Sequence, residues 1–376
     1  MKWNDFEALK TPFFLIDCDE LLLHMERFQK RCSLLNIKPL LSIKGFPLAS
    51  VFGLISPFLS GVSAASPFEA LLGKRLGKEV HIHAPAYKEE DFNSISKCCD
   101  HIVFNSLNQW KQYQGKIGTT NNSISCGLRI NPEFSEIEIE KYNPCLPYSR
   151  FGVTVDKLLH ENINGIEGFH MHVMCDQGAN TLVRVIEAVT QKFGDYFPQL
   201  RWINLGGGHQ LSSPEYKSEL LIKPMLALTS NLDVYVEPCE SIVTSSGYLV
   251  STVMDIVDNG KKTVILDTSA ICHMPDVLDM PYRPDLVYPS DLPNGTYRYL
   301  FAGISCLPGD IIGEYSFDHP LSIGEKVVFS DMGAYTFAKE SYFNGINFPS
   351  IVLYSKHDGL RIVKSFGYKD YESQYL

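Results

Sequence analysis

The sequence lacks a long apolar run, and its longest apolar segments, such as 51–55, fall far below the roughly 20 residues of a membrane-spanning helix. It also lacks an apolar stretch near its N-terminus, where charges are scattered, so we expect no secretory signal and no membrane association. Basic residues are not in excess, because 33 Lys and Arg stand against 43 Asp and Glu, for a net charge of −10. We therefore expect no nucleic-acid partner.

Cysteine pairs with zinc-binding spacing are also missing, although the chain has ten cysteines. Cys98 and Cys99 are adjacent, and the others are scattered along the chain. We therefore expect no metal site, and we expect reduced thiols that pack mostly as small core residues in a cytoplasmic protein.

The remaining composition is that of a globular protein, with 45% hydrophobic and 20% charged residues. At about 150 residues per domain, a chain of 376 residues suggests two domains, or one large barrel with an appendage. No internal repeat or low-complexity tract argues for a different organisation.

Strand patterns alternate with helical patterns through the first 240 residues. The expected strands are 13–16, 38–43, 61–63, 80–83, 101–104, 126–130, 168–173, 201–205 and 232–236. One helix is expected to begin after Asp17 and another near 89, and four more cover 47–55, 67–76, 107–113 and 181–193. The helices 47–55 and 67–76 each start with a proline, which suits a first helical position. Alternation predicts a parallel sheet, and about eight such units in ~210 residues predict a closed (β/α)8 barrel of the TIM type.

The character of the sequence changes after residue 241, where helical periodicity nearly disappears. Strand-like segments at 248–257, 263–266, 297–302 and 325–329 are separated by turn signals. This pattern predicts a C-terminal β-sandwich or β-barrel domain. We assign 18–240 to the barrel and 1–17 with 241–376 to the β domain, although the initial strand on its own suits either domain.

Four polar features follow expected barrel strands: Lys44, His172, the glycines 206–208 and Glu237. Each has an ordinary structural explanation: a solvated strand end, a core histidine, a tight turn and a strand terminator, respectively. However, the active site of a parallel barrel lies where its strands end, so the four together point to one site.

These four features suit pyridoxal 5′-phosphate. A lysine can bind the cofactor aldehyde, and a carboxylate can pair with the protonated pyridine nitrogen. Backbone amides of a glycine-rich loop can hold a phosphate at a helix N-terminus, and an imidazole can stack on the ring. The sequence therefore predicts a cofactor-binding site at the carboxyl ends of the barrel strands.

Several longer stretches carry a resemblance to a known family. They are RINPE at 129–133, YNPC at 142–145, SRFG at 149–152, WINLGGGH at 202–209, HMPDVLDMPYRP at 273–284, CLPGD at 306–310, IGEYSF at 312–317 and DMGAY at 331–335. With them the chain resembles the fold-III pyridoxal phosphate decarboxylases, the alanine-racemase-like family that includes ornithine and diaminopimelate decarboxylases. Within that family the likeness is greatest to the carboxynorspermidine/carboxyspermidine decarboxylases, and it extends over nearly the whole chain.

The resemblance implies a role for each candidate residue. It implies that Lys44 binds the cofactor, that His172 stacks on it, that Gly206, Gly207 and Gly208 hold its phosphate with Tyr335, and that Glu237 pairs with the ring nitrogen. It further implies a homodimer with shared active sites, in which Cys306 and Asp310 reach into the partner's site. Lys44, His172 and Cys306 are then the catalytic residues, and Cys306 or Lys44 returns a proton to Cα. From the residues alone, a packed core thiol is the favoured interpretation of Cys306.

The implied reaction is removal of the α-carboxylate of carboxynorspermidine or carboxyspermidine. Because such a substrate carries extra ammonium groups, acidic residues should line its tail pocket. Glu240, Asp276 and Asp310 are the candidates, and Asp176 is considered with them. The alternatives are that Asp176 caps the following helix and that Asp276 closes a turn.

The chain departs from the family pattern at four places. Lys44 lies in Ser-Ile-Lys-Gly where the family usually has Ala-Leu-Lys-Ala, and Cys239 replaces a glycine. His172 is followed by Val-Met-Cys-Asp, and Ser63 stands where relatives often carry Asp or Ala. If position 239 needs a positive φ, a cysteine there is strained. Two alternatives therefore stay open: a decarboxylase of another amino acid or specialised-metabolite intermediate, or a non-catalytic regulatory homologue.

Overall fold

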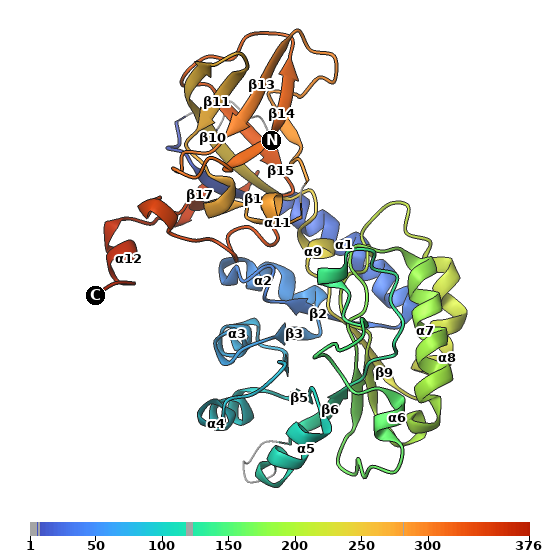
Figure 1. The fold of residues 1–376 in the computed structure, drawn as a ribbon. Coiled ribbons are helices and arrows are strands. Elements are labelled where there is room, and N and C mark those ends of the chain that lie inside the picture. The colour runs from blue at the N-terminus through green and yellow to red at the C-terminus, as the bar shows by residue number, and fades with distance from the viewer. Residues whose placement is uncertain (1–5, 7, 118–122, 281) are drawn as a thin grey trace. The chain divides into compact units, whose positions relative to one another are not determined.

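The computed structural model describes residue 6 and residues 8–117, 123–280 and 282–376. The described residues form two compact units, which we call the barrel unit and the sheet unit (Figure 1). The barrel unit is His24–Ile242, and the sheet unit combines the described residues of Met1–Leu23 and Val243–Leu376. Of the stretch 273–284, Pro281 lies outside the described residues.

The barrel unit contains, within the described ranges, eight parallel strands that close in the order β2 to β9. They are β2 (Lys38–Ser42), β3 (Gly61–Ala64), β4 (Glu79–His83), β5 (His101–Phe104), β6 (Ser125–Arg129), β7 (Gly168–His170), β8 (Trp202–Asn204) and β9 (Asp233–Val236). Pairing of Lys38 with Tyr235 and of Pro39 with Val236 closes β9 onto β2. The carboxyl ends of all eight strands therefore meet at one rim.

Helices connect these strands. They are α1 (Cys18–Leu35), α2 (Phe52–Ile55), α3 (Pro67–Gly73), α4 (Glu89–Cys98), α5 (Leu107–Tyr113), α6 (Val155–Leu158), α7 (Ala179–Phe193), α8 (Ile222–Thr229) and α9 (Glu240–Val243). The hydroxyl oxygens of Ser66 and Ser106 cap α3 and α5 by accepting from the amides of Glu69 and Gln109. Among the described helices, none combines the length and the apolar character needed to cross a bilayer.

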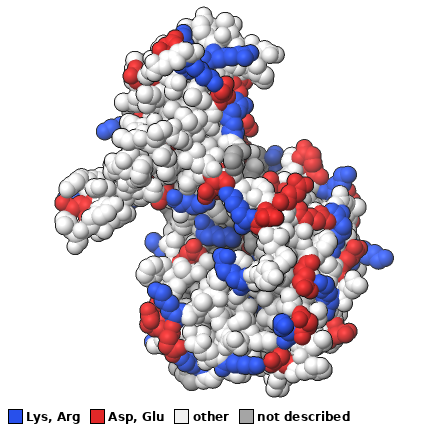
Figure 2. Space-filling model, in the orientation of Figure 1, with Lys and Arg blue, Asp and Glu red and all other residues white. Residues whose placement is uncertain are grey.

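Trp202 fills the barrel interior against two glycines. A Cβ on Gly168 would lie 2.0 Å from the indole, and a Cβ on Gly127 would lie 2.4 Å from it. Since real Cβ atoms do not approach that closely, both positions require glycine for the indole to fit. On the face of the molecule shown in Figure 2, basic and acidic side chains are interspersed.

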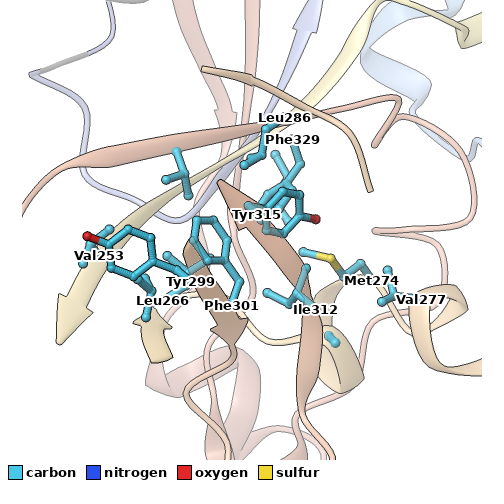
Figure 3. Packing of buried hydrophobic residues seen from close by; sticks show 14 of the residues in the cluster. Val253, Leu266, Met274, Val277, Leu286, Tyr299, Phe301, Ile312, Tyr315 and Phe329 are labelled. Carbon is cyan, nitrogen blue, oxygen red and sulfur yellow. The ribbon is translucent and has the colours of Figure 1, made fainter. Parts of the chain in front are cut away.

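The sheet unit is built, as far as the structure describes it, on nine strands of mixed direction. They are β1 (Phe13–Asp17), β10 (Gly247–Asp258), β11 (Lys262–Leu266), β12 (Leu286–Tyr288), β13 (Tyr297–Ala302), β14 (Ile311–Phe317), β15 (Lys326–Ser330), β16 (Ser350–Ser355) and β17 (Gly359–Lys364). Three short helices complete it: α10 (Ala270–His273), α11 (Asp276–Asp279) and α12 (Tyr368–Glu372). Figure 3 shows its core, in which Phe301, Tyr315 and Phe329 pack together.

The initial strand pairs within the sheet unit, antiparallel to β10 and parallel to β16. This pairing answers the question that the sequence left open for residues 13–16. Asp17 then caps α1, because its Oδ1 accepts from the amides of Asp19 and Glu20 at 3.0 and 3.1 Å.

The predicted fold class, a (β/α)8 barrel with a separate β domain, is confirmed. Some details differ. Pro47 precedes the helical turn instead of starting it, and the sequence did not predict β12, β14, β16 or β17. The strand expected at 168–173 ends at His170, and the carbonyl oxygens of Met171 and Met174 lie against the glycine loop after β8.

Candidate active site

Lys44 lies in a tight turn immediately after β2, and its side chain is exposed. The amide of Ile43 donates to Ser63 O at 3.0 Å, and that of Ser42 donates to Pro238 O at 3.1 Å. These bonds tie the turn to the ends of both neighbouring strands. Among the described residues, the Lys44 amine has no hydrogen-bond or ion-pair partner. The structure therefore presents a fixed backbone and an available amine at this rim.

Glu237 follows β9, and one of its two carboxylate oxygens, Oε1, is held by neighbouring side chains. Asn204 Nδ2 donates to Oε1 at 2.8 Å, and Nε2 of the buried His170 approaches the same oxygen to 3.3 Å without the alignment of a hydrogen bond. Burial on its own opposes ionisation, but charge interaction with His170 and neighbouring imidazoles holds the pKa of Glu237 well below its usual range. Within the described chain, Oε2 accepts no hydrogen bond. Glu237 is thus an ionised carboxylate with one oxygen to spare.

His172 is neutral and oriented by the glycine loop. The amide of Gly207 donates to His172 Nδ1 at 2.9 Å, so Nδ1 is an acceptor and the ring proton lies on Nε2. Burial, reinforced by the positive charge of Lys44, holds the pKa of His172 well below its usual range. Burial lowers the pKa of His170, and the charge of Lys44 lowers it further. Lys44, His170, His172 and Glu237 therefore share one electrostatic environment.

The glycine loop differs from the expected phosphate cradle. Gly206 and Gly208 have φ of +73° and +80°, and Cβ atoms on the three glycines would lie 2.1–2.5 Å from carbonyl oxygens. The amide of Gly206 donates to Asn204 Oδ1 at 2.8 Å, and that of Gly207 serves His172. Of the three amides, only that of Gly208 donates to no described protein atom. No helix begins here either, since the next helical turn starts at Ser218.

Cys239 is buried and lies before α9, which begins at the exposed Glu240. Among the described non-glycine residues with positive φ, Cys239 does not occur. The backbone strain expected for a cysteine at this position is therefore absent.

Asp310 is buried and already accepts hydrogen bonds within the sheet unit. It is only 2% exposed, and its carboxylate accepts from Ser269 Oγ at 2.8 Å, from the Ala270 amide at 2.7 Å and from the Ser305 amide at 3.1 Å. These donors come from two segments of the sheet unit, so the carboxylate supports its own loop. The assignment of Asp310 to substrate binding stays a prediction.

Two other acidic candidates are engaged inside their own units. Asp276 begins α11 and forms an ion pair with Lys339. Asp176 accepts from Gln210 Nε2 at 2.8 Å and does not cap α7, whose N-cap is Gly178 without a side-chain bond. The expected helix cap at Asp176 is therefore wrong.

Cys306 and Tyr335 both belong to the sheet unit. Cys306 is exposed, and its amide donates to Asn344 Oδ1 at 2.8 Å. Tyr335 is half-buried with φ of +55°. The barrel unit thus brings together Lys44, His172 and Glu237, whereas Cys306, Tyr335, Asp276 and Asp310 lie in the sheet unit.

Sequence reasoning missed four polar residues at the rim: His83, Arg129, His170 and Asn204. They are the last residues of β4, β6, β7 and β8. Arg129 Nη1 donates to His83 Nε2 at 3.0 Å, and the rings of His83 and His170 stack at 4.7 Å. Burial lowers the pKa of Arg129 to about 10 and that of His83 well below its usual range. A polar residue at the last position of an apolar strand was the available signal.

A second polar cluster, also missed, lies at the amino ends of β4 and β5. Glu79, His81 and His101 each place one side-chain oxygen or nitrogen of a kind that can bind a metal ion within 4.8 Å of the others. Glu79 Oε2 accepts from Tyr235 Oη at 3.0 Å and contacts His81 Nε2 at 3.2 Å, and the two imidazoles stack at 3.8 Å. These contacts lie at the end of the barrel opposite the rim, where polar contacts contribute to stability rather than to catalysis.

Comparison with known proteins shows the family to which this chain belongs. A family model with the description "Pyridoxal-dependent decarboxylase, C-terminal sheet domain" matches residues 13–333. A carboxynorspermidine/carboxyspermidine decarboxylase from Campylobacter jejuni is 37% identical, covering 97% of this chain and 98% of its own length. A carboxyaminopropylagmatine decarboxylase from a Synechocystis species is 36% identical, covering 98% of this chain and 96% of its own.

Solved structures give the same result. The carboxynorspermidine decarboxylase from Campylobacter jejuni, complexed with norspermidine, matches with a TM-score of 0.89 at 34% identity, over 97% of this chain and all of that one. Diaminopimelate decarboxylase from Helicobacter pylori, complexed with L-lysine, matches with a TM-score of 0.83 at 19% identity, over 99% of each chain, which shows a shared fold. The resemblance expected from the sequence is confirmed: this chain belongs to the pyridoxal-dependent decarboxylases, enzymes that remove carboxylate groups with the aid of pyridoxal phosphate.

Proposed function

We propose that this chain removes the α-carboxylate of carboxynorspermidine or carboxyspermidine to yield norspermidine or spermidine. The observation that carries the proposal is the 37% identity to the Campylobacter jejuni carboxynorspermidine/carboxyspermidine decarboxylase over nearly the full length of both chains. We further propose that it acts in the cytoplasm as a homodimer.

The rim residues fit pyridoxal 5′-phosphate. Lys44 offers an amine without a described partner, Glu237 offers an ionised carboxylate with Oε2 unused, and His172 offers a neutral ring. In this proposal Lys44 binds the cofactor aldehyde. When bound, the pyridine ring accepts the electron pair that the departing carboxylate leaves on the substrate.

Glu237 keeps the pyridine nitrogen protonated, because an ionised carboxylate accepts that proton in a charge-assisted hydrogen bond. Asn204 holds Oε1, so the carboxylate cannot rotate freely and Oε2 is left for the nitrogen. His172 packs on the ring as a neutral imidazole, fixed by the Gly207 amide.

For the phosphate we propose the Gly208 amide and the Tyr335 hydroxyl. Gly206 and Gly207 contribute by allowing the loop to close against the strand ends, since their own amides are occupied. This narrows the role that the resemblance implied for the three glycines.

Proton return to Cα requires an acid near the reacting carbon after carbon dioxide leaves. We propose the exposed Cys306 thiol of a second copy of the chain, with Lys44 as the alternative donor. Of the acidic candidates for the substrate tail, Glu240 at the start of α9 stays in the proposal.

A second candidate substrate is carboxyaminopropylagmatine, because the Synechocystis relative that decarboxylates it is almost as similar to this chain. Carbon dioxide release from carboxynorspermidine, carboxyspermidine, carboxyaminopropylagmatine, diaminopimelate and ornithine decides between them. Preferred turnover of the first two supports the proposal, and turnover of another member alone rejects it.

The Lys44→Ala variant tests the alternative that this chain is a non-catalytic homologue. Loss of both the visible absorbance of the bound cofactor and turnover in that variant excludes the alternative. Lys38→Ala is the matched control, because Lys38 lies at the other end of the same strand and pairs with Asp233 at 2.8 Å. That variant should keep its colour and activity. A wild-type protein that stays colourless with pyridoxal phosphate would favour the regulatory alternative.

A further inference from the structure

The sheet unit contains an open pocket of about 530 Å³, within the range of small-ligand sites. Glu340 and Tyr342 line it from one segment, and Gln374 and Tyr375 line it from the C-terminal end of the chain. None of its eight lining residues is Lys or Arg. The pocket thus has a carboxyl group and no basic side chain of its own.

Glu340 differs from the other acidic residues of this unit. Its Oε1 is buried and, in the described chain, has no hydrogen-bond partner. The adjacent Lys339 does not serve it, because Lys339 pairs with Asp276. Burial raises the pKa of Glu340 to about 9. A carboxyl group held in this way gains most from an incoming cation.

The pocket wall suits an ammonium group on an apolar chain. Tyr342 stacks on Phe348 with ring centroids 3.8 Å apart, and Phe343 and Tyr375 add further aromatic surface. Aromatic faces attract cations, and they also accommodate methylene groups. A carboxyl beside aromatic rings therefore matches an alkyl ammonium better than it matches an anion.

We propose that the Glu340 pocket binds one ammonium group of an aliphatic polyamine, through an ion pair with Glu340 and cation–π contact with its aromatic wall. This inference rests on the proposed function for its choice of ligand. The ammonium belongs either to the tail of a carboxypolyamine substrate or to free polyamine product. In the first case Glu340 takes the specificity role that the sequence assigned to Asp276 and Asp310.

The binding has a predictable pH dependence. The titratable groups facing Glu340 are Cys272 of α10, Tyr342 and Tyr375, and burial raises the pKa of both Cys272 and Tyr342. Because the pKa of Glu340 is about 9, its carboxyl is protonated near pH 7 when no ligand is bound. It must lose that proton to pair with an ammonium. Affinity should rise about tenfold per pH unit up to about pH 9, with one proton released per site.

The test is calorimetric titration of the holoenzyme with norspermidine at pH 7, in two buffers of different protonation enthalpy. Glu340→Gln should weaken binding tenfold or more and abolish the proton release. Glu314→Gln is the matched control, because Glu314 is an exposed residue of the same unit that pairs with Lys261. Equal affinity and equal proton release in wild type and Glu340→Gln would overturn the proposal.

A second variant guards against a folding defect. Gln374 is exposed and lines the pocket, so Gln374→Glu adds a carboxylate without disturbing a core. It should tighten norspermidine binding several-fold, and unchanged affinity counts against the site. Because titration needs no turnover, failure of the decarboxylase proposal is separable from failure of this one.

Kinetics identify the source of the ammonium. If the substrate tail occupies the pocket, Glu340→Gln raises KM for carboxynorspermidine with little change in kcat. If free product occupies it, KM is unchanged and non-competitive inhibition by norspermidine is lost. Either result supports the site. If Glu340→Gln alters neither KM nor inhibition, and norspermidine binding is also intact, the proposal is contradicted.

Discussion

The amide of Gly207 donates to Nδ1 of His172 at 2.9 Å, so a loop after β8 sets the tautomer of a ring after β7. The same glycine has no room for a side chain, since a Cβ would lie 2.5 Å from Glu237 O and 3.4 Å from His172 Cε1. One position therefore controls the placement of two groups that we assign to the cofactor.

Gly207→Ala should reduce kcat/KM at least tenfold and weaken cofactor affinity, because the added methyl must displace Glu237 or His172. Cofactor titration followed by absorbance measures the change. Gly53→Ala is the control, since a Cβ there meets nothing within 4 Å. Wild-type cofactor affinity in Gly207→Ala would show that the loop adjusts freely.

Asn204→Ala should move the acid limb of the activity–pH profile upward by about 1–2 units. The lost hydrogen bond to a charged oxygen is worth about 1.5–3 kcal/mol, and it favours the ionised form of Glu237, so its removal raises the pKa of that carboxyl. Activity above the new pKa should be largely retained. An unshifted profile with uniformly low activity would indicate a packing defect at this buried residue instead.

Gly168→Ala should destabilise the barrel unit by about 3 kcal/mol, because the new methyl overlaps the indole of Trp202 at 2.0 Å. Thermal unfolding followed by tryptophan fluorescence reports the loss. Gly115→Ala, where a Cβ meets nothing within 4 Å, should leave the melting temperature near that of wild type.

Acidification should destabilise the protein through its buried histidines. Burial lowers the pKa of His209 and of His273 to about 4, below the unfolded value near 6.5. Since the unfolded state binds more protons across this window, stability is full above pH 6.5 and falls towards pH 4, by up to about 3 kcal/mol per histidine. Melting temperatures from pH 7.5 to 4.5 should decline less steeply in His273→Gln. An identical slope in that variant would assign the acid sensitivity elsewhere.

Asp310→Asn should lower the melting temperature by several degrees, because an amide cannot satisfy the four donors that converge on this carboxylate. The KM for the substrate should change little. A raised KM at an unchanged melting temperature would restore the substrate role that the sequence suggested for this residue.

The barrel rim was predictable from sequence where polar residues interrupt an apolar pattern. Lys44 and Glu237 stand just beyond their strands, so they were visible as strand-end features. His83 and Arg129 are the last residues of their strands and looked like ordinary members of them. Their contact joins the ends of β4 and β6 across β5, and strand patterns do not show which strand-end side chains reach each other.

The acidic residues of the sheet unit were harder to assign, because a sequence does not show which carboxylate already has partners. The donors to Asp310 and Asp276 lie 5 to 63 positions away in the sequence: Ser305 is 5 residues from Asp310, and Lys339 is 63 residues from Asp276. Glu340 attracted no attention, yet it is the one whose buried oxygen lacks a described partner. Tertiary neighbours, which sequence spacing does not specify, decided each case.

The strand β1 has a consequence for synthesis of the protein. It lies between β10 and β16, so residues made first cannot complete their pairing until residues 350–355 have left the ribosome. The intervening barrel residues emerge earlier and have all their strand partners among themselves. We expect the barrel to fold co-translationally while the leading segment waits, so truncation before β16 should leave a folded barrel with an exposed, aggregation-prone strand.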